Sequence, residues 1–134
     1  MSANLDVVRS IFEDRERGDY SSTKWADPEM ELVIPDGPAP GRWTGLAGVR
    51  EGVRDWLRAW EDFRIQAEEY RELDDERVLV LTRASGRGKT SGLEIAQVGA
   101  AGACLLHIRD RKVTTYIVYF DRDRALADLG LKGG

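Results

Sequence analysis

Apolar residues in the first half of the chain recur with the spacing of helices. The first stripe is formed by Leu5, Val8, Ile11 and Phe12 and predicts a helix over residues 5–17 that ends near Gly18. A second stripe is formed by Val49, Val53, Trp56, Leu57 and Trp60 and predicts a helix from about residue 46 to 61. We also expect a short helix over residues 19–29, closing on Trp25 and broken before Pro28.

The rest of the pattern is typical of strands. They are expected over residues 30–35, 63–73, 78–83, 93–98, 103–109 and 113–121, with a short closing helix or turn over residues 121–131. Helices followed by a meander of largely antiparallel strands predict an α+β fold, formed by residues 1–134 as a single domain. The run 78–81 is apolar at every position, which is typical of a strand covered on both faces. We expect the helices on one face and a second copy of the chain on the other, giving a homodimer through the outer sheet face.

Composition limits the partners and cofactors. The net charge is −4 and the basic residues are scattered, which argues against a nucleic-acid partner. One cysteine and one histidine cannot form a disulfide or a zinc cluster, although a site made only of carboxylates is left open. No apolar run reaches membrane length, and no secretory signal pattern is present. We therefore expect a cytoplasmic protein with no membrane contact, no metal and no cofactor.

Residues 84–92, ASGRGKTSG, resemble the end of a phosphate-binding loop. The required spacing places Arg83 where the first glycine of such a loop should stand. The flanking segments, 77–83 and 91–98, are both typical of strands, whereas a phosphate loop leads from a strand into a helix. The segment therefore predicts a hairpin. Phosphate or nucleic-acid binding through Arg83, Arg87 and Lys89 is a weaker alternative.

Several motifs together resemble the nuclear transport factor 2-like superfamily, nearest to its SnoaL-like and ketosteroid-isomerase-like small proteins. They are the turn Trp43-Thr44-Gly45, the helical WLRAW, and the stretches RASGRGKTSGLEI and HIRDRKVTTYIVYFDRDRALADLGL. The resemblance covers roughly residues 5–131. It implies a cone-shaped curved sheet packed on N-terminal helices around one apolar pocket, often in a homodimer. The superfamily includes isomerases, cyclases, dehydratases, epoxide hydrolases and non-catalytic binders, so the resemblance implies no single activity.

The catalytic residues of ketosteroid isomerases do not carry over to this chain. Their tyrosine donor corresponds to Ile11, their aspartate base to about Val33, and their second donor falls near Cys104. Isoleucine and valine side chains can neither donate a hydrogen bond to an enolate nor accept a proton. The Arg-x-Asp plus distant Asp arrangement that limonene-epoxide-hydrolase-like members use is not found either. We therefore do not expect steroid isomerisation by the ketosteroid-isomerase mechanism.

Two glutamates are candidate proton carriers. By strand alternation Glu31 shares the face of Val33 and would point into the pocket as a general base with a raised pKa. The alternative is a solvent-facing residue on an edge strand. Glu94 would face Arg83 across the hairpin, with the arginine orienting an anionic substrate. The alternative is a cross-strand ion pair that sets the hairpin register.

His107 is the third candidate proton carrier, because its ordinary pKa suits proton transfer near neutral pH. Strand alternation places it on the face opposite Cys104, so a surface or dimer-interface histidine is the alternative. Cys104 itself would line the pocket, but no histidine shares its face to activate it as a nucleophile.

The expected pocket wall combines aromatic residues with the groups above. The residues expected there are Trp25, Val33, Trp43, Trp56, Trp60, Arg83, Cys104 and Tyr116. Such a wall would take a flat or cyclic apolar molecule, although the same residues would look identical in a filled core. The hypothesis is a pocket protein catalysing cofactor-independent acid–base isomerisation, cyclisation, hydration or hydrolysis of an apolar cyclic compound. The alternative is a non-catalytic ligand-binding or homodimerisation module of the same fold.

Overall fold

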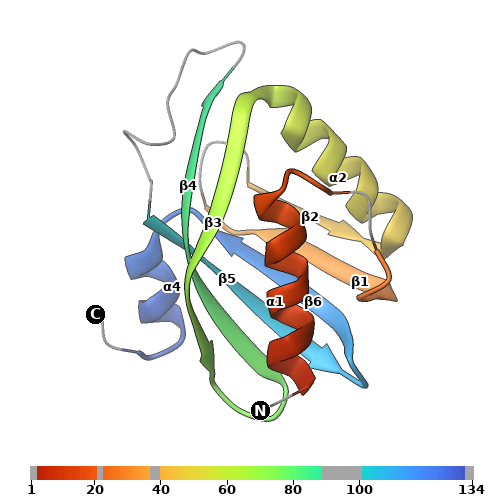
Figure 1. The fold of residues 1–134 in the computed structure, drawn as a ribbon, viewed down its shortest axis with the longest axis vertical. Coiled ribbons are helices and arrows are strands. Elements are labelled where there is room, and N and C mark those ends of the chain that lie inside the picture. The colour runs from red at the N-terminus through yellow and green to blue at the C-terminus, as the bar shows by residue number, and fades with distance from the viewer. Residues whose placement is uncertain (1–2, 21–22, 37–39, 89–100, 132–134) are drawn as a thin grey trace.

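The computed structural model describes residues 3–20, 23–36, 40–88 and 101–131. Within them lie α1 (Ala3–Glu16), β1 (Ala26–Ile34), β2 (Gly41–Thr44), α2 (Gly45–Ala59), β3 (Trp60–Glu72), β4 (Arg77–Gly88), β5 (Ala101–Arg109), β6 (Lys112–Tyr119) and α4 (Arg122–Asp128). These described strands form one curled sheet in the order β2-β1-β6-β5-β4-β3, and among them only the β1–β6 pair is parallel. The predicted α+β cone is confirmed (Figure 1).

The first helix forms as its stripe predicts. Val8, Ile11 and Phe12 are buried against the sheet. Gly18 ends the helix with a φ of +79°, a conformation that glycine adopts without strain. The Asp19 amide then donates to the Asp14 carbonyl, which closes the last turn. This C-cap fixes the direction in which the chain leaves α1 and so where the next residues lie.

The short helix expected over residues 19–29 is wrong for the part of that segment that the structure describes. Lys24 and Trp25 form a turn, and β1 begins at Ala26. The Val113 amide donates to the Trp25 carbonyl at 2.8 Å, so pairing with the distant β6 overrides the local helical pattern. Strand β2 was also missed: only a turn was expected at Trp43, which lies opposite Leu32 in the β1–β2 pair.

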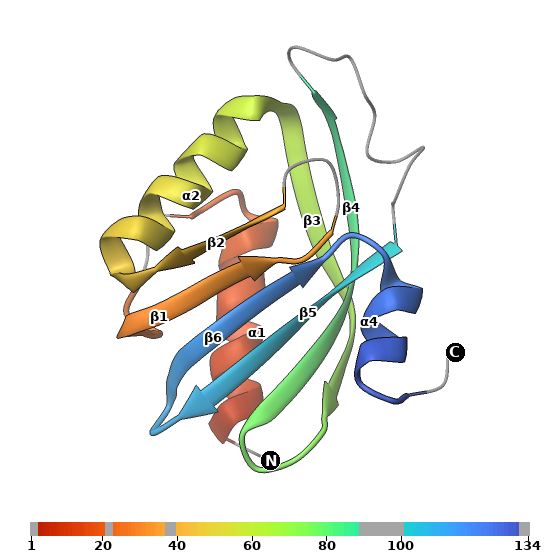
Figure 2. The same cartoon turned by 180° about the vertical axis from the view of Figure 1, so that it is seen from behind.

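The apolar strand β4 is covered on both faces by its own chain. Val78 and Val80 belong to the core cluster that includes residues of α1, whereas Leu79 and Leu81 pack with Ala125 and Leu126 of α4. Figure 2 shows α4 on the face of the sheet opposite to α1. The run 78–81 therefore does not require a partner molecule, and the homodimer stays a prediction.

The glycine-rich segment continues a strand as far as the structure describes it. β4 runs to Gly88, which pairs with Trp60 of β3. Residues 84–88 are therefore part of a strand and do not form the loop that would lead from a strand into a helix in a phosphate site. The second predicted hairpin strand, 93–98, lies outside the described residues, as do Lys89 and Glu94.

Among the described residues, no helix is long and apolar enough to cross a membrane. In those same ranges, no three His, Cys, Asp or Glu side chains are arranged to hold a metal.

Candidate functional site

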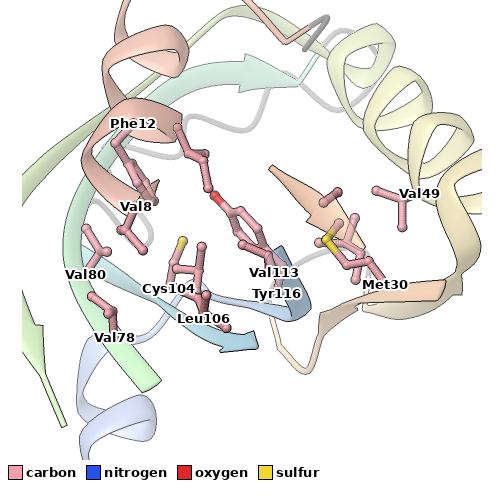
Figure 3. Close-up of a cluster of buried hydrophobic side chains, with 14 residues drawn as sticks. Val8, Phe12, Met30, Val49, Val78, Val80, Cys104, Leu106, Val113 and Tyr116 are labelled. Atoms are coloured by element: carbon pink, nitrogen blue, oxygen red, sulfur yellow. The ribbon is translucent and has the colours of Figure 1, made fainter. Parts of the chain in front are cut away.

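A cavity of about 100 Å³ lies between α2 and the sheet. Every strand except β2 contributes to its wall, because the sheet curls around it. The described lining residues are Arg15, Tyr20, Trp25, Met30, Leu32, Ile34, Val49, Gly52, Val53, Trp56, Phe63, Ile65, Thr82, Ala84, Gly102, Cys104, Tyr116, Val118, Tyr119 and Phe120. Figure 3 shows the Tyr116 ring between the two helices, with Phe12 of α1 on one side and Met30 and Val49 on the other.

A wider space of about 470 Å³, here called the vestibule, adjoins this cavity. The two share the lining residues Arg15, Tyr20, Trp25, Met30, Val49 and Val53. The vestibule adds Thr23, Arg50, Arg54, Leu57 and Arg58. It therefore extends from the cavity between α2 and the segment that follows α1.

Arg15 is the charged residue at the junction of the two spaces. It lies on the sheet-facing side of α1, one turn beyond Ile11 and Phe12, and is half-buried. Its guanidinium carbon is 4.5 Å from the ring centroid of Tyr20 and 5.6 Å from that of Trp25. Such cation–π contacts hold a guanidinium in place without neutralising its charge.

The hydroxyl of Tyr20 is buried and has no hydrogen-bond partner among the described residues. Burial raises the pKa of this phenol, and the positive charge of Arg15 opposes part of that increase. The group is therefore neutral near pH 7 and can donate a hydrogen bond. A buried hydroxyl without a partner costs stability, and this one lies at the cavity wall.

Cys104 and Tyr116 form a second polar pair at the cavity wall. Burial raises the pKa of the Cys104 thiol to about 12, and the neighbouring Tyr116 hydroxyl opposes part of that increase. Burial also raises the pKa of Tyr116. Both groups are therefore protonated near neutral pH. A neutral thiol is a weak nucleophile, so Cys104 is unsuited to covalent chemistry here.

Of the residues expected at the pocket wall, the structure places Trp25, Trp56, Cys104 and Tyr116 on the cavity. Trp60 is buried behind Trp56, with ring centroids 5.2 Å apart, and does not line the cavity. Trp43 does not line the cavity and packs over Gly52, whose added Cβ would lie 2.8 Å from the indole.

The inward orientation expected for Glu31 and Val33 is wrong. Met30, Leu32 and Ile34 are buried on the cavity side of β1, so the two intervening side chains point to the other face. Glu31 instead forms an ion pair with Arg42 of β2, with Oε2 3.2 Å from Nη1. The predicted alternation of side chains along this strand is correct, but the pocket-facing side was assigned from Val33, which lies on the other face.

The other polar candidates also lie away from the cavity. Arg83 is exposed and its Nε lies 3.0 Å from Glu68 on β3; its expected partner Glu94 lies outside the described residues. His107 lies opposite Arg77 in the β4–β5 pair, on the face away from the cavity, as strand alternation predicts. Burial and the charge of Arg77 lower the pKa of His107.

Sequence reasoning missed Arg15 and Tyr20. Arg15 continues the apolar stripe of α1, and a charged residue at such a position is a usable signal for a functional group. Tyr20 carries no comparable signal, because its place depends on how the chain leaves the C-cap at Gly18. Thr82 was assigned only to a strand, and it is a buried polar residue of the cavity wall.

No protein-family model matches the chain, and no curated protein matches it in sequence. Solved structures do match it. An NTF2-like protein of unknown function from Burkholderia pseudomallei has a TM-score of 0.74 and 21% identity, over 95% of this chain and 97% of that chain. TerC co-crystallised with polyporic acid has a TM-score of 0.72 and 21% identity, over 96% and 98%. A candidate SnoaL-like polyketide cyclase from Jannaschia has a TM-score of 0.69 and 12% identity, over 87% and 83%. The chain has the nuclear transport factor 2-like fold.

Proposed function

We propose that this chain binds a small, ring-containing apolar molecule in the cavity, which it enters through the vestibule. The observation that carries the proposal is the cavity itself, lined mainly by aromatic and aliphatic side chains with a few polar groups among them. Such a combination of apolar wall and few polar groups is usual for small-molecule sites. The similarity to a structure co-crystallised with polyporic acid, and to a candidate polyketide cyclase, supports the same class of ligand.

The dimensions indicate how a ligand would divide between the two spaces. An apolar cavity of roughly 150 Å³ can hold one benzene ring, so the inner cavity of about 100 Å³ suits a single ring with slight adjustment. Drug-sized ligands occupy sites of roughly 300–1,000 Å³, and the vestibule of about 470 Å³ supplies that room. The ligand would place one ring beside Trp56 and the remainder near Trp25.

The binding proposal is tested with a neutral fluorescent probe, N-phenyl-1-naphthylamine. The wild-type protein should bind it saturably with one probe per chain. Val53→Phe places a larger side chain at the junction of cavity and vestibule, where it should block the probe. We expect affinity to fall by about tenfold or more, which corresponds to a loss of about 1.4 kcal/mol or more in binding free energy. Val33→Phe is the matched control, because Val33 lies on the other face of β1. Equal binding by both variants, or no saturable binding, would contradict the proposal.

Catalysis is the second candidate, and the unpartnered hydroxyl of Tyr20 favours it. Beside Arg15 it could donate to the oxygen of a carbonyl substrate as negative charge develops there. The described residues of the cavity wall include no aspartate, glutamate or histidine to accept a proton. Without such a base in the described wall, binding is the function that the cavity supports best. Glu94, outside the described residues, stays the candidate base.

The catalytic candidate is tested by following deuterium exchange into the carbon next to the carbonyl of 2-tetralone, a cyclic ketone, by NMR. Catalysed exchange that falls about a hundredfold or more in Tyr20→Phe and in Glu94→Gln would support it, since a general acid or base typically contributes 10²–10⁴-fold. Binding of the ketone without catalysed exchange would leave the chain as a non-catalytic binder.

A further inference from the structure

The vestibule is strongly basic although the chain as a whole is acidic. Its described lining contains Arg15, Arg50, Arg54 and Arg58, but no aspartate or glutamate. The whole chain, by contrast, has 24 acidic residues and a net charge of −4. A local concentration of one sign of charge in a hollow attracts ligands of the opposite sign.

The spacing of three of these arginines places them on one face of α2. Arg50, Arg54 and Arg58 stand four residues apart, so like charges are neighbours along the helix. Such pairs destabilise a helix slightly, and no ion pair within the described residues offsets the charge of Arg54 or Arg58. Arg50 donates to the Thr23 hydroxyl at 2.9 Å and so links α2 to the other wall of the vestibule.

The inner end of this basic surface meets the cavity at Arg15. Its guanidinium lies over the Tyr20 ring, and the hydroxyl of that residue is buried without a partner among the described residues. A cation and a hydrogen-bond donor are thus adjacent at the point where the wall changes from polar to apolar. An anionic oxygen accepts hydrogen bonds from both kinds of group, and guanidinium binds carboxylates in a planar geometry.

We infer that the ligand is an organic anion: a cyclic apolar compound that carries one acidic group, such as a carboxylate or an ionised enol. Its ring occupies the inner cavity, and its acidic group binds Arg15 and Tyr20. Arg54 and Arg58 draw it into the vestibule without contacting it in the final position. This inference rests on the proposed binding function and adds the charge of the ligand to it.

The test compares two probes that share one aromatic framework. 8-Anilino-1-naphthalenesulfonate is anionic, and N-phenyl-1-naphthylamine is the same framework without the sulfonate. The wild-type protein should bind the anionic probe about ten- to a hundredfold more tightly, because a hydrogen bond to a charged group contributes that much affinity. Arg15→Met should remove this preference, so that the two probes bind with similar affinity, and Arg15→Lys should restore part of it.

Arg54→Gln keeps the inference testable if substitution of Arg15 prevents folding. It should slow association of the anionic probe by about two- to tenfold at low ionic strength and change little at high ionic strength. Arg109→Gln is the matched control, since it removes one exposed arginine that does not line either space. An equal effect of the two variants would assign the preference to general surface charge and overturn the inference.

The failures of the two proposals can be told apart. Equal affinity for both probes, with the neutral one bound at one per chain and blocked by Val53→Phe, would overturn the anionic ligand and leave the binding function standing. Absence of saturable binding of either probe would overturn both.

Discussion

The guanidinium carbon of Arg15 lies 4.5 Å from the centroid of the Tyr20 ring, at the junction of the cavity and the vestibule. The two residues come from either side of the C-cap at Gly18, so the end of one helix positions both. Their contact combines a fixed positive charge with a buried hydroxyl that lacks a partner within the described part of the chain. Arg15 is the charged residue of the described cavity wall, whose other members are mainly apolar.

Tyr20→Phe should separate function from stability. Removing a buried hydroxyl without a partner should raise the free energy of unfolding of the ligand-free protein by about 1 kcal/mol, because the desolvation cost disappears. The same change should weaken binding of the anionic probe by about tenfold, as a donor to the anion is lost. Chemical denaturation and probe titration of the same preparation give both values. A less stable variant with unchanged affinity would show that the hydroxyl is structural.

Gly102→Ala and Gly48→Ala should have opposite effects on stability. A Cβ at Gly102 would lie 2.5 Å from the Tyr119 carbonyl oxygen, a backbone atom that cannot move aside without disturbing β6. We expect a loss of about 2 kcal/mol or more, as for overpacked interiors. A Cβ at Gly48 in α2 meets nothing within 4 Å, and alanine should stabilise the helix by about 0.5–1 kcal/mol. Denaturant unfolding of both variants tests the pair, and a tolerated Gly102→Ala would contradict the close approach of β5 and β6.

Leu126→Ala should show that α4 closes the second face of the sheet. Leu126 is 2% exposed and packs with Leu79 and Leu81 of β4. Its truncation should lower the free energy of unfolding by about 2–4 kcal/mol, the usual cost of removing a buried leucine. Leu129→Ala is the matched control, since Leu129 is only partly buried and should cost about 1 kcal/mol. Equal small losses would indicate that α4 is not part of the core.

Alkaline pH should destabilise the fold through the buried Cys104. The thiol has a pKa of about 12 in the folded chain, against an ordinary value of about 8.5. As pH rises, the unfolded chain loses this proton first, which favours unfolding. The contribution of this thiol to the free energy of unfolding is fully present below about pH 8.5. It is lost between there and about pH 12, at up to about 1.4 kcal/mol per pH unit.

Cys104→Ala isolates that effect. The variant should be less stable at neutral pH because it leaves a cavity, yet its free energy of unfolding should fall less steeply above about pH 9. Burial raises the pKa of Tyr20 and of Tyr116 in the same direction, so part of the alkaline loss should persist. Identical pH slopes for the wild type and the variant would contradict the burial of the thiol.

The helices could be predicted from the sequence because each carries its information locally. The stripe through Val8 and Phe12 and the stop at Gly18 define α1 without reference to the rest of the chain. The start of β1 could not be predicted in this way. It depends on parallel pairing with β6, more than eighty residues away in the chain, where Ala26 lies opposite Val113.

The candidate site was harder to predict, for two physical reasons. Strand alternation places Glu31 and Leu32 on opposite faces but does not say which face is covered. Because the prediction has Val33 facing the pocket, both faces of the strand are assigned the wrong way round. Arg15 could have been found, because it extends an apolar helical stripe. Its contact with Tyr20 depends on the path of the chain after the helix and is visible only in three dimensions.

Binding of an anionic ring compound at Arg15 is best tested with a crystal structure of the protein with 8-anilino-1-naphthalenesulfonate. An aromatic ring of the probe should lie between Trp56 and Met30, with its sulfonate within hydrogen-bonding distance of Arg15 and the Tyr20 hydroxyl. A probe bound elsewhere on the surface, with the cavity closed by its own side chains, would contradict it.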